Sequence, residues 1–276
     1  MSLPVCRFPL LALAVALVAS RAAAGPVADP NLEAAIRATL KLDDKTELTE
    51  ENLRNVFVLE APGKAIKSLS GLEKCPNLAL LNVARNEIAD VGPLKGLPNL
   101  QSLDLGKNQI TDVGPLAESK ALQYLVLADN QITDIGPLQG LTKLAALDLS
   151  GNRITDIGPL QGLTGLASLH LARNQITDLA PLAQVTKLST LDISDNPITD
   201  LTPLKAQTEL RILVAQRDKL EDLTPLVEMA QADAAGPKLV APFLRLYLGG
   251  NPLSEAAKTT QVEALKAAGV RVDLNS

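Results

Sequence analysis

Leucine and isoleucine return at fixed positions every 22 residues between Asn55 and Ala230. In the unit 143–164, KLAALDLSGNRITDIGPLQGLT, Leu147 and Leu149 alternate with small or polar residues. This is the period expected of a strand with one buried face. Units of the same spacing stand directly before and after it. Repetition at such a period predicts a solenoid, because one unit cannot bury its own apolar stripe without neighbours.

The rest of the unit predicts how the chain returns to begin the next strand. Asn152 ends the strand, and its amide can donate to and accept from backbone groups, so stacked copies would form a ladder. Ile154, Ile157 and Leu160 are expected to face the same core from the returning side. Pro159 favours a short helical turn at this point, because its missing N–H costs nothing at the first helical position.

Stacking the units would line up two polar positions of the repeat into rows, one occupied mostly by asparagine and the other mostly by aspartate. Departures from both rows fall in the first and last copies, as expected of units with only one regular neighbour. We interpret the aspartates as turn residues rather than as ligands, since Asp readily accepts from nearby backbone N–H groups. The asparagine row reads Lys64, Asn86, Asn108, Asn130, Asn152, Asn174, Asn196, Asp218, and the aspartate row reads Ser68, Asp90, Asp112, Asp134, Asp156, Asp178, Asp200, Asp222.

The first 24 residues have the pattern of a secretory signal peptide. Arg7 precedes an apolar run over 8–18, and three alanines at 22–24 offer a small-residue cleavage site. The apolar run is too short for a membrane span. We therefore expect the mature chain to be exported, either to the periplasm or out of the cell, with no stable membrane insertion after cleavage.

The segments that flank the repeats predict caps, which a solenoid needs to cover its terminal units. Asp29 followed by Pro30 is typical of a helix start, and so is Thr49 before two glutamates. Ser254 begins a further helix near the other end. The expected organisation is a signal peptide at 1–24, a helical N-terminal cap at 25–54, eight 22-residue repeats at 55–230, an inserted loop at 231–242, and a final repeat strand plus helical C-terminal cap at 243–276.

The core N-x-I-x-D-I-x-P-L of the 22-residue unit resembles the bacterial internalin-type leucine-rich repeats. The segments DPNLEAAIRATL and NPLSEAAKTTQVEALKAAGVRV resemble the flanking parts of exported bacterial proteins of this class. The resemblance implies an α/β fold: a curved right-handed solenoid with a parallel sheet on the concave face and short 3-10 turns on the convex face. It also implies a binding role, since such proteins serve as recognition scaffolds.

Side chains that alternate with the core leucines are expected on the concave face, where solenoids commonly bind. Neighbouring strands lie about 4.8 Å apart, so Asp148, His170 and Asp192 should stand side by side, with Ser168 on the same face. Tyr124 is the best anchor candidate because hot spots favour aromatic residues. Basic residues near the strand ends (Arg85, Lys107, Arg173, Arg217) could form a charged rim. The predicted partner-binding residues are Asp104, Tyr124, Val126, Asp148, His170, Asp192, Arg173 and Tyr247.

Composition narrows the function further. The formal net charge is −5, and the signal segment carries two arginines and no acid, so the mature chain is more acidic still. An acidic surface argues against nucleic acid as a partner. We therefore predict a monomeric, non-enzymatic module that binds a protein or peptide and needs no metal or cofactor. The alternatives are a structural, self-assembling envelope protein and, more remotely, a hydrolase or metal-dependent site around His170.

Overall fold

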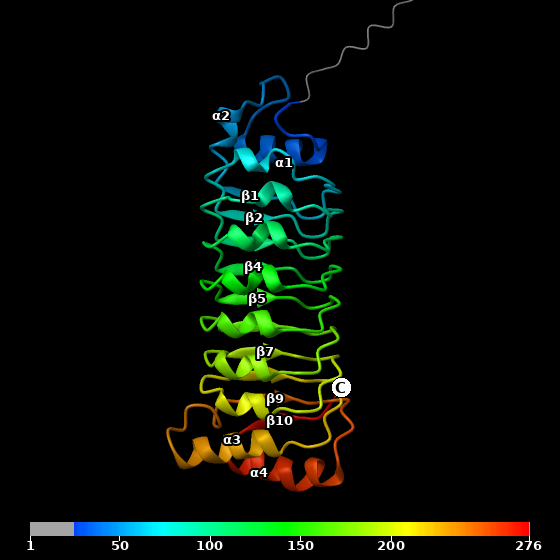
Figure 1. The fold of residues 1–276 in the computed structure, drawn as a ribbon, viewed down its shortest axis with the longest axis vertical. Coiled ribbons are helices and arrows are strands. Elements are labelled where there is room, and N and C mark those ends of the chain that lie inside the picture. Colours follow the sequence, from blue (N-terminus) through cyan, green and yellow to red (C-terminus); the bar gives the residue numbers. More distant parts are fainter. Residues whose placement is uncertain (1–24, 276) are drawn as a thin grey trace, which may run out of the picture.

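The computed structural model describes residues 25–275, and in it every repeat contributes one strand to a single sheet. Ten parallel strands follow one another in sequence order, so the chain forms one tall column of stacked rungs (Figure 1). The predicted fold class is confirmed. The strands are β1 Val58–Glu60, β2 Leu80–Asn82, β3 Ser102–Asp104, β4 Tyr124–Val126, β5 Ala146–Asp148, β6 Ser168–His170, β7 Thr190–Asp192, β8 Ile212–Val214, β9 Arg245–Tyr247 and β10 Arg271–Asp273.

Short turns of helix close each rung opposite the sheet. Most begin with Gly-Pro, Ala-Pro or Thr-Pro, as the fixed φ of proline favours. They stack on one another along the column (Figure 1). The 3-10 turns are η1 Leu72–Lys74, η2 Gly92–Leu94, η3 Gly114–Glu118, η4 Gly136–Gly140, η5 Gly158–Gly162, η6 Ala180–Gln184 and η7 Thr202–Ala206.

A continuous apolar core runs up the column between the sheet and the turns. The central residue of each strand from β1 to β9 is buried; Leu147, for example, is 1% exposed. Leu149, Ile154, Ile157 and Leu160 complete the rung from its other sides and are equally buried. The first and third residues of each strand point away from this core. We call the surface that they form the sheet face, and it corresponds to the predicted concave face.

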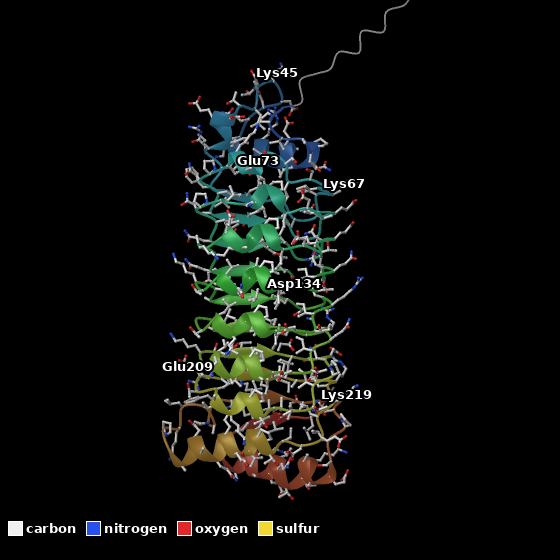
Figure 2. All side chains as sticks on the ribbon, viewed as in Figure 1. Lys45, Lys67, Glu73, Asp134, Glu209 and Lys219 are labelled. Atoms are coloured by element: carbon white, nitrogen blue, oxygen red, sulfur yellow. The ribbon has the colours of Figure 1, made fainter. Side chains whose placement is uncertain are left out.

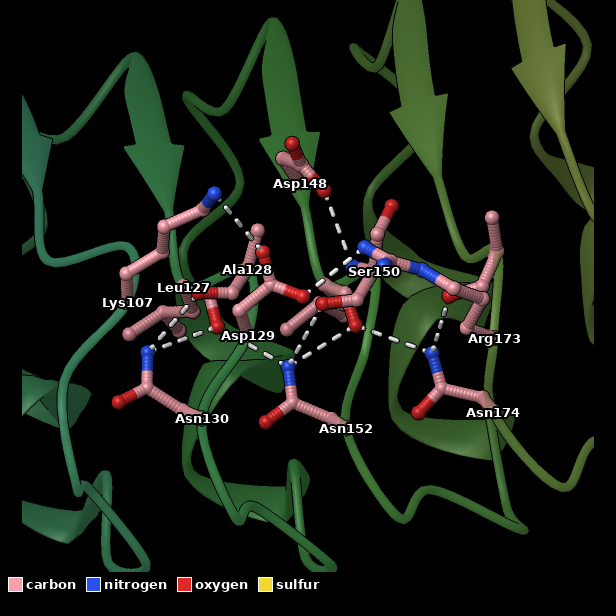
Figure 3. A network of polar contacts seen from close by, with 12 residues as sticks. Lys107, Leu127, Ala128, Asp129, Asn130, Asp148, Ser150, Asn152, Arg173 and Asn174 are labelled. Carbon is pink, nitrogen blue, oxygen red and sulfur yellow. Dashed lines mark hydrogen bonds and ion pairs between the residues drawn. The ribbon is translucent and has the colours of Figure 1, made fainter. Parts of the chain in front are cut away.

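The predicted asparagine ladder joins the rungs beside the sheet. Asn152 Nδ2 donates to the carbonyl oxygens of Leu149 in its own repeat, at 2.9 Å, and of Leu127 in the preceding repeat, at 3.0 Å. Its Oδ1 accepts from the backbone N–H of Ile132 at 3.0 Å. Asn130 and Asn174 repeat this arrangement (Figure 3). Each buried amide therefore satisfies backbone groups of two successive repeats.

The aspartate row is confirmed as turn chemistry. Asp156 Oδ1 accepts from the backbone N–H of Gly158 at 2.7 Å, immediately before η5. Asp134, labelled in Figure 2, makes the same bond to Gly136. Figure 2 also shows charged side chains along both edges of the column, with Lys67 on one edge and Glu209 on the other.

The N-terminal cap consists of α1 Pro30–Leu40 and α2 Glu50–Leu53. Asp29 caps α1 through its Oδ1, and its Oδ2 accepts from the backbone N–H groups of Lys67 and Ser68 in the first repeat. Burial opposes ionisation of Asp29, but these hydrogen bonds outweigh it and lower the pKa of the carboxyl. One carboxylate thus fastens the cap to the solenoid.

The C-terminal cap differs in part from the predicted boundaries. Helix α3 Thr224–Ala235 takes the place of a 3-10 turn and extends into the segment 231–242 that we expected to be a loop. Asp233 accepts backbone N–H groups of Leu239, Val240 and Ala241, which fixes the following turn. After β9, the π-helical turn η8 Ala257–Gln261 continues into α4 Val262–Ala267.

Candidate binding site on the sheet face

The register of the sheet places most of the predicted site residues in one row along the column, from β3 to β9. His170 pairs with Asp148 on one side and with Asp192 on the other. The same row also holds Asp104, Val126 and Tyr247. All of these side chains are partly exposed. The third residues of the strands, from β1 to β10, form the row Glu60, Asn82, Asp104, Val126, Asp148, His170, Asp192, Val214, Tyr247, Asp273.

The carboxylates of this row are held in a common orientation. Oδ1 of Asp104, Asp148 and Asp192 accepts the backbone N–H of the second residue after it, at 2.9, 2.9 and 3.0 Å respectively. This local bond is the one that Asp and Asn commonly make in turns. The other carboxylate oxygen of each has no hydrogen-bond partner within residues 25–275, and the turn bond holds the charge of each side chain in place.

Ser168 lies on the sheet face next to His170. Its Oγ is 3.1 Å from Nε2 of the imidazole, and which atom donates depends on the tautomer. No carboxylate hydrogen bond to the ring occurs within residues 25–275. Over the same residues, no group of three His, Cys, Asp or Glu side chains is placed to hold a metal ion. The geometry around His170 therefore gives no support to a metal site.

Tyr124 stands out from the sheet face. It is 53% exposed and is the first residue of β4, where its row neighbours are the small side chains of Ser102 and Ala146. Val126 lies on the same strand and points to the same face. A large exposed ring between small neighbours forms a raised apolar spot, which is the kind of feature that anchors protein interfaces.

Most residues of the predicted basic rim form ion pairs with acidic residues that occupy the same position in other repeats. Arg173 Nη2 lies 2.9 Å from Asp129 Oδ1, although two rungs separate them, and Lys107 approaches the same carboxylate at 4.0 Å (Figure 3). This reach is possible because Gly151 occupies the intervening rung without a side chain.

Arg217 in this rim binds Asp195 through two hydrogen bonds of 2.7 Å, and the guanidinium holds the pKa of that carboxyl below its usual value. Asp129, Asp195 and Gly151 were not among the residues predicted from the sequence. All three lie at the left-handed position that follows each strand, where every residue of the row has a positive φ. Aligning this position across the repeats would have revealed that acidic residues share it with the basic ones.

Comparison with known proteins identifies the repeat. The leucine-rich repeat family model matches residues 98–154, a two-copy leucine-rich repeat model matches 76–118 and 142–184, and a third model matches 186–201. No curated protein sequence matches the chain. The leucine-rich repeat fold is typical of protein–protein recognition modules.

Solved structures give a closer likeness. Internalin C2 from Listeria monocytogenes is 28% identical with a TM-score of 0.66, and the alignment covers 90% of this chain and 94% of that one. A leucine-rich repeat protein from Leptospira interrogans is 25% identical with a TM-score of 0.55, over 74% of this chain and 45% of that one. The repeat unit, the single parallel sheet and these matches together show that the chain is built from leucine-rich repeats and that it is similar to the internalins.

Proposed function

We propose that this protein is an exported, non-enzymatic recognition module that binds a protein or peptide through its sheet face. The observation that carries the proposal is the exposed Tyr124 at the middle of an open ten-stranded sheet. Solenoids of this kind offer extended surfaces for binding. The contact surface would include Tyr124 and Val126 together with the row Asp104, Asp148, His170, Asp192, Tyr247, and Arg173 would contribute at the rim.

Export rests on the pattern of residues 1–24, which lie outside the described residues. Across residues 25–275, no helix is long and apolar enough to cross a membrane. The proposal places the protein in the periplasm or outside the cell. Intact mass spectrometry of protein recovered from these fractions should show loss of the N-terminal segment, and an uncleaved chain in the cytoplasm would contradict export.

A cross-linking pull-down from the native compartment tests the recognition role. Tyr124→Arg places a charge at the apolar spot and should abolish capture of the partner. Gln161→Arg is the matched control, since it adds the same charge to the exposed surface of η5 on the opposite side of the column. Equal capture by both variants would show that the sheet face around Tyr124 is not the binding site.

Self-assembly is the second candidate, and the edge of the sheet favours it. The outer edge of β10 pairs with no strand of the described residues. Free edges present unpaired N–H and C=O groups that can join another chain. Sedimentation velocity over a range of concentrations separates the two roles: recognition alone predicts a monomer throughout, whereas assembly predicts reversible association.

A hydrolase is favoured by the contact between Ser168 and His170. Nucleophilic catalysis needs a serine within hydrogen-bond reach of a base, and this pair meets that condition. It also needs donors for the developing oxyanion. If the protein hydrolyses an ester probe, the turnover should disappear in His170→Ala; turnover that persists in this variant would exclude the pair.

A further inference from the structure

The carboxylates of the sheet face follow a period of two rungs. Glu60, Asp104, Asp148 and Asp192 lie on β1, β3, β5 and β7, and each is 44 residues from the next. The strands between them carry other residues at the same position. Because adjacent strands are about 4.8 Å apart, successive carboxylates are about 9.6 Å apart along the column.

The fold does not require these charges. Asn82, in the same row, makes the same turn bond with its Oδ1, to the backbone N–H of Ala84 at 3.1 Å. The neutral amide therefore serves the turn as well as Asp104 or Asp148 does. At these aspartates one oxygen is used by the turn and the other has no hydrogen-bond partner within residues 25–275. The regular negative charge is thus left for a cationic ligand.

The spacing selects the conformation of a bound peptide. A polyproline II helix has three residues per turn and rises about 3.1 Å per residue, so side chains at every third position are about 9.3 Å apart on one face. A β-strand repeats on one face at about 6.6 Å. An α-helix offers about 10.5 Å at every seventh residue. Over the three intervals of the row, the polyproline II spacing stays closest to that of the carboxylates.

Tyr124 supports the same conformation. Its ring lies on β4, between the rungs of Asp104 and Asp148, and half of it is exposed. Polyproline II segments dock against exposed aromatic side chains through their prolines. At the other end of the sheet face, Arg245 and Arg271 are neighbours on β9 and β10. They would repel a cationic peptide, which confines it to the strands β1 to β7.

We infer that the sheet face binds a cationic polyproline II segment with Arg or Lys at every third position, each basic side chain meeting one carboxylate of the row. This inference rests on the proposed recognition function and adds the chemistry of the partner. The proline rings between the basic residues contact Tyr124 and Val126. The stiffness of the segment reduces the entropy lost on binding.

Two synthetic peptides of identical composition test the spacing. One repeats Arg-Pro-Pro four times, and the other places four arginines before eight prolines. Isothermal titration calorimetry at low and moderate salt should show about tenfold tighter binding of the first peptide, since only it meets several carboxylates at once. Equal affinities would reduce the interaction to unspecific charge attraction and would overturn the inference, as would tighter binding of an alanine-rich helix with Arg at every seventh position.

A pair of variants tests whether the carboxylates of the sheet face contribute to binding. Asp148→Asn keeps the turn bond, as Asn82 shows, and should weaken binding of the repeating peptide about threefold. Asp156→Asn removes the same charge from the aspartate row of the same repeat and should leave the affinity unchanged. An equal loss in both variants would mean that only net charge matters. If neither peptide binds while Tyr124→Arg still loses a captured partner, the chemistry proposed here fails and the recognition role survives.

Discussion

Asp218 holds the place that asparagine occupies in the six preceding repeats, and it cannot make the same bonds when ionised. Asn196 Nδ2 donates to the carbonyl oxygens of Ile193 at 2.8 Å and Leu171 at 3.0 Å. Asp218 Oδ1 accepts from the backbone N–H of Asn196 at 2.8 Å, but its Oδ2 is buried and has no partner. A protonated carboxyl could donate at this point as the amide does.

The surroundings of Asp218 favour that protonated form. Burial raises the pKa of the carboxyl to about 7, with Asp195 and Asp192 adding to the rise, while the N–H of Asn196 and the charge of Arg217 oppose it. The pKa is higher in the folded than in the unfolded chain. Its contribution to stability is therefore fully present below the ordinary value near 3.8 and is lost as pH rises through about 7.

Asp218→Asn should remove this pH dependence. We expect the variant to gain about 2 kcal/mol in free energy of unfolding at pH 8 relative to the unaltered protein, and much less at pH 5. Urea unfolding at several pH values measures it. Asn196→Asp, one rung earlier, is the reciprocal variant and should become less stable as pH rises. A gain for Asp218→Asn that is equal at pH 5 and pH 8 would contradict a titrating carboxyl.

At the scale of elements, the 22-residue period was sufficient to predict the strands, the turns and both polar rows. Leu147, Asn152 and Asp156 each have a role that depends on backbone geometry repeated in every rung, so pattern and structure coincide. The end of α3 at Ala235 was not predictable in this way, because the segment after Ala230 has no neighbouring copy that fixes its conformation. The pairing of Arg173 with Asp129 depends on a rotamer that reaches across two rungs.

The ion pair between Arg173 and Asp129 also allows a prediction for Gly151, which lies between them at the left-handed position after β5. Gly151 has φ +67°, and a Cβ there would collide with Asp129 Oδ1 and lie 3.3 Å from Arg173 Nη2. Gly151→Ala should break the ion pair and add left-handed strain, lowering the free energy of unfolding by about 1–2 kcal/mol. Gly162→Ala, in the same repeat, is the control because its nearest contact would be an ordinary 3.8 Å. Equal stabilities in urea unfolding would show that Gly151 provides no needed space.

At the scale of the whole molecule, the column is held together mainly by contacts between neighbouring rungs. The contacts of each strand are with the strands directly before and after it, and the turns contact in the same order. Stability in such a chain is close to a sum of repeat and interface contributions. The consequence of a substitution should therefore depend on where along the column it falls, even when the number of lost hydrogen bonds is similar.

Two substitutions test this dependence by hydrogen exchange. Asp29→Ala removes bonds to Asn31, Leu32, Lys67 and Ser68 at one end of the column, and should speed exchange in the N-terminal cap and β1 while β5 stays protected. Asn152→Ala removes the bonds that join the central repeats and leaves the buried backbone N–H of Ile132 without its acceptor, so it should lower protection on both sides of β5 by about 2 kcal/mol. Uniform loss of protection over the whole chain in both variants would instead indicate that the column unfolds as a single cooperative unit, in which the position of a rung has no influence.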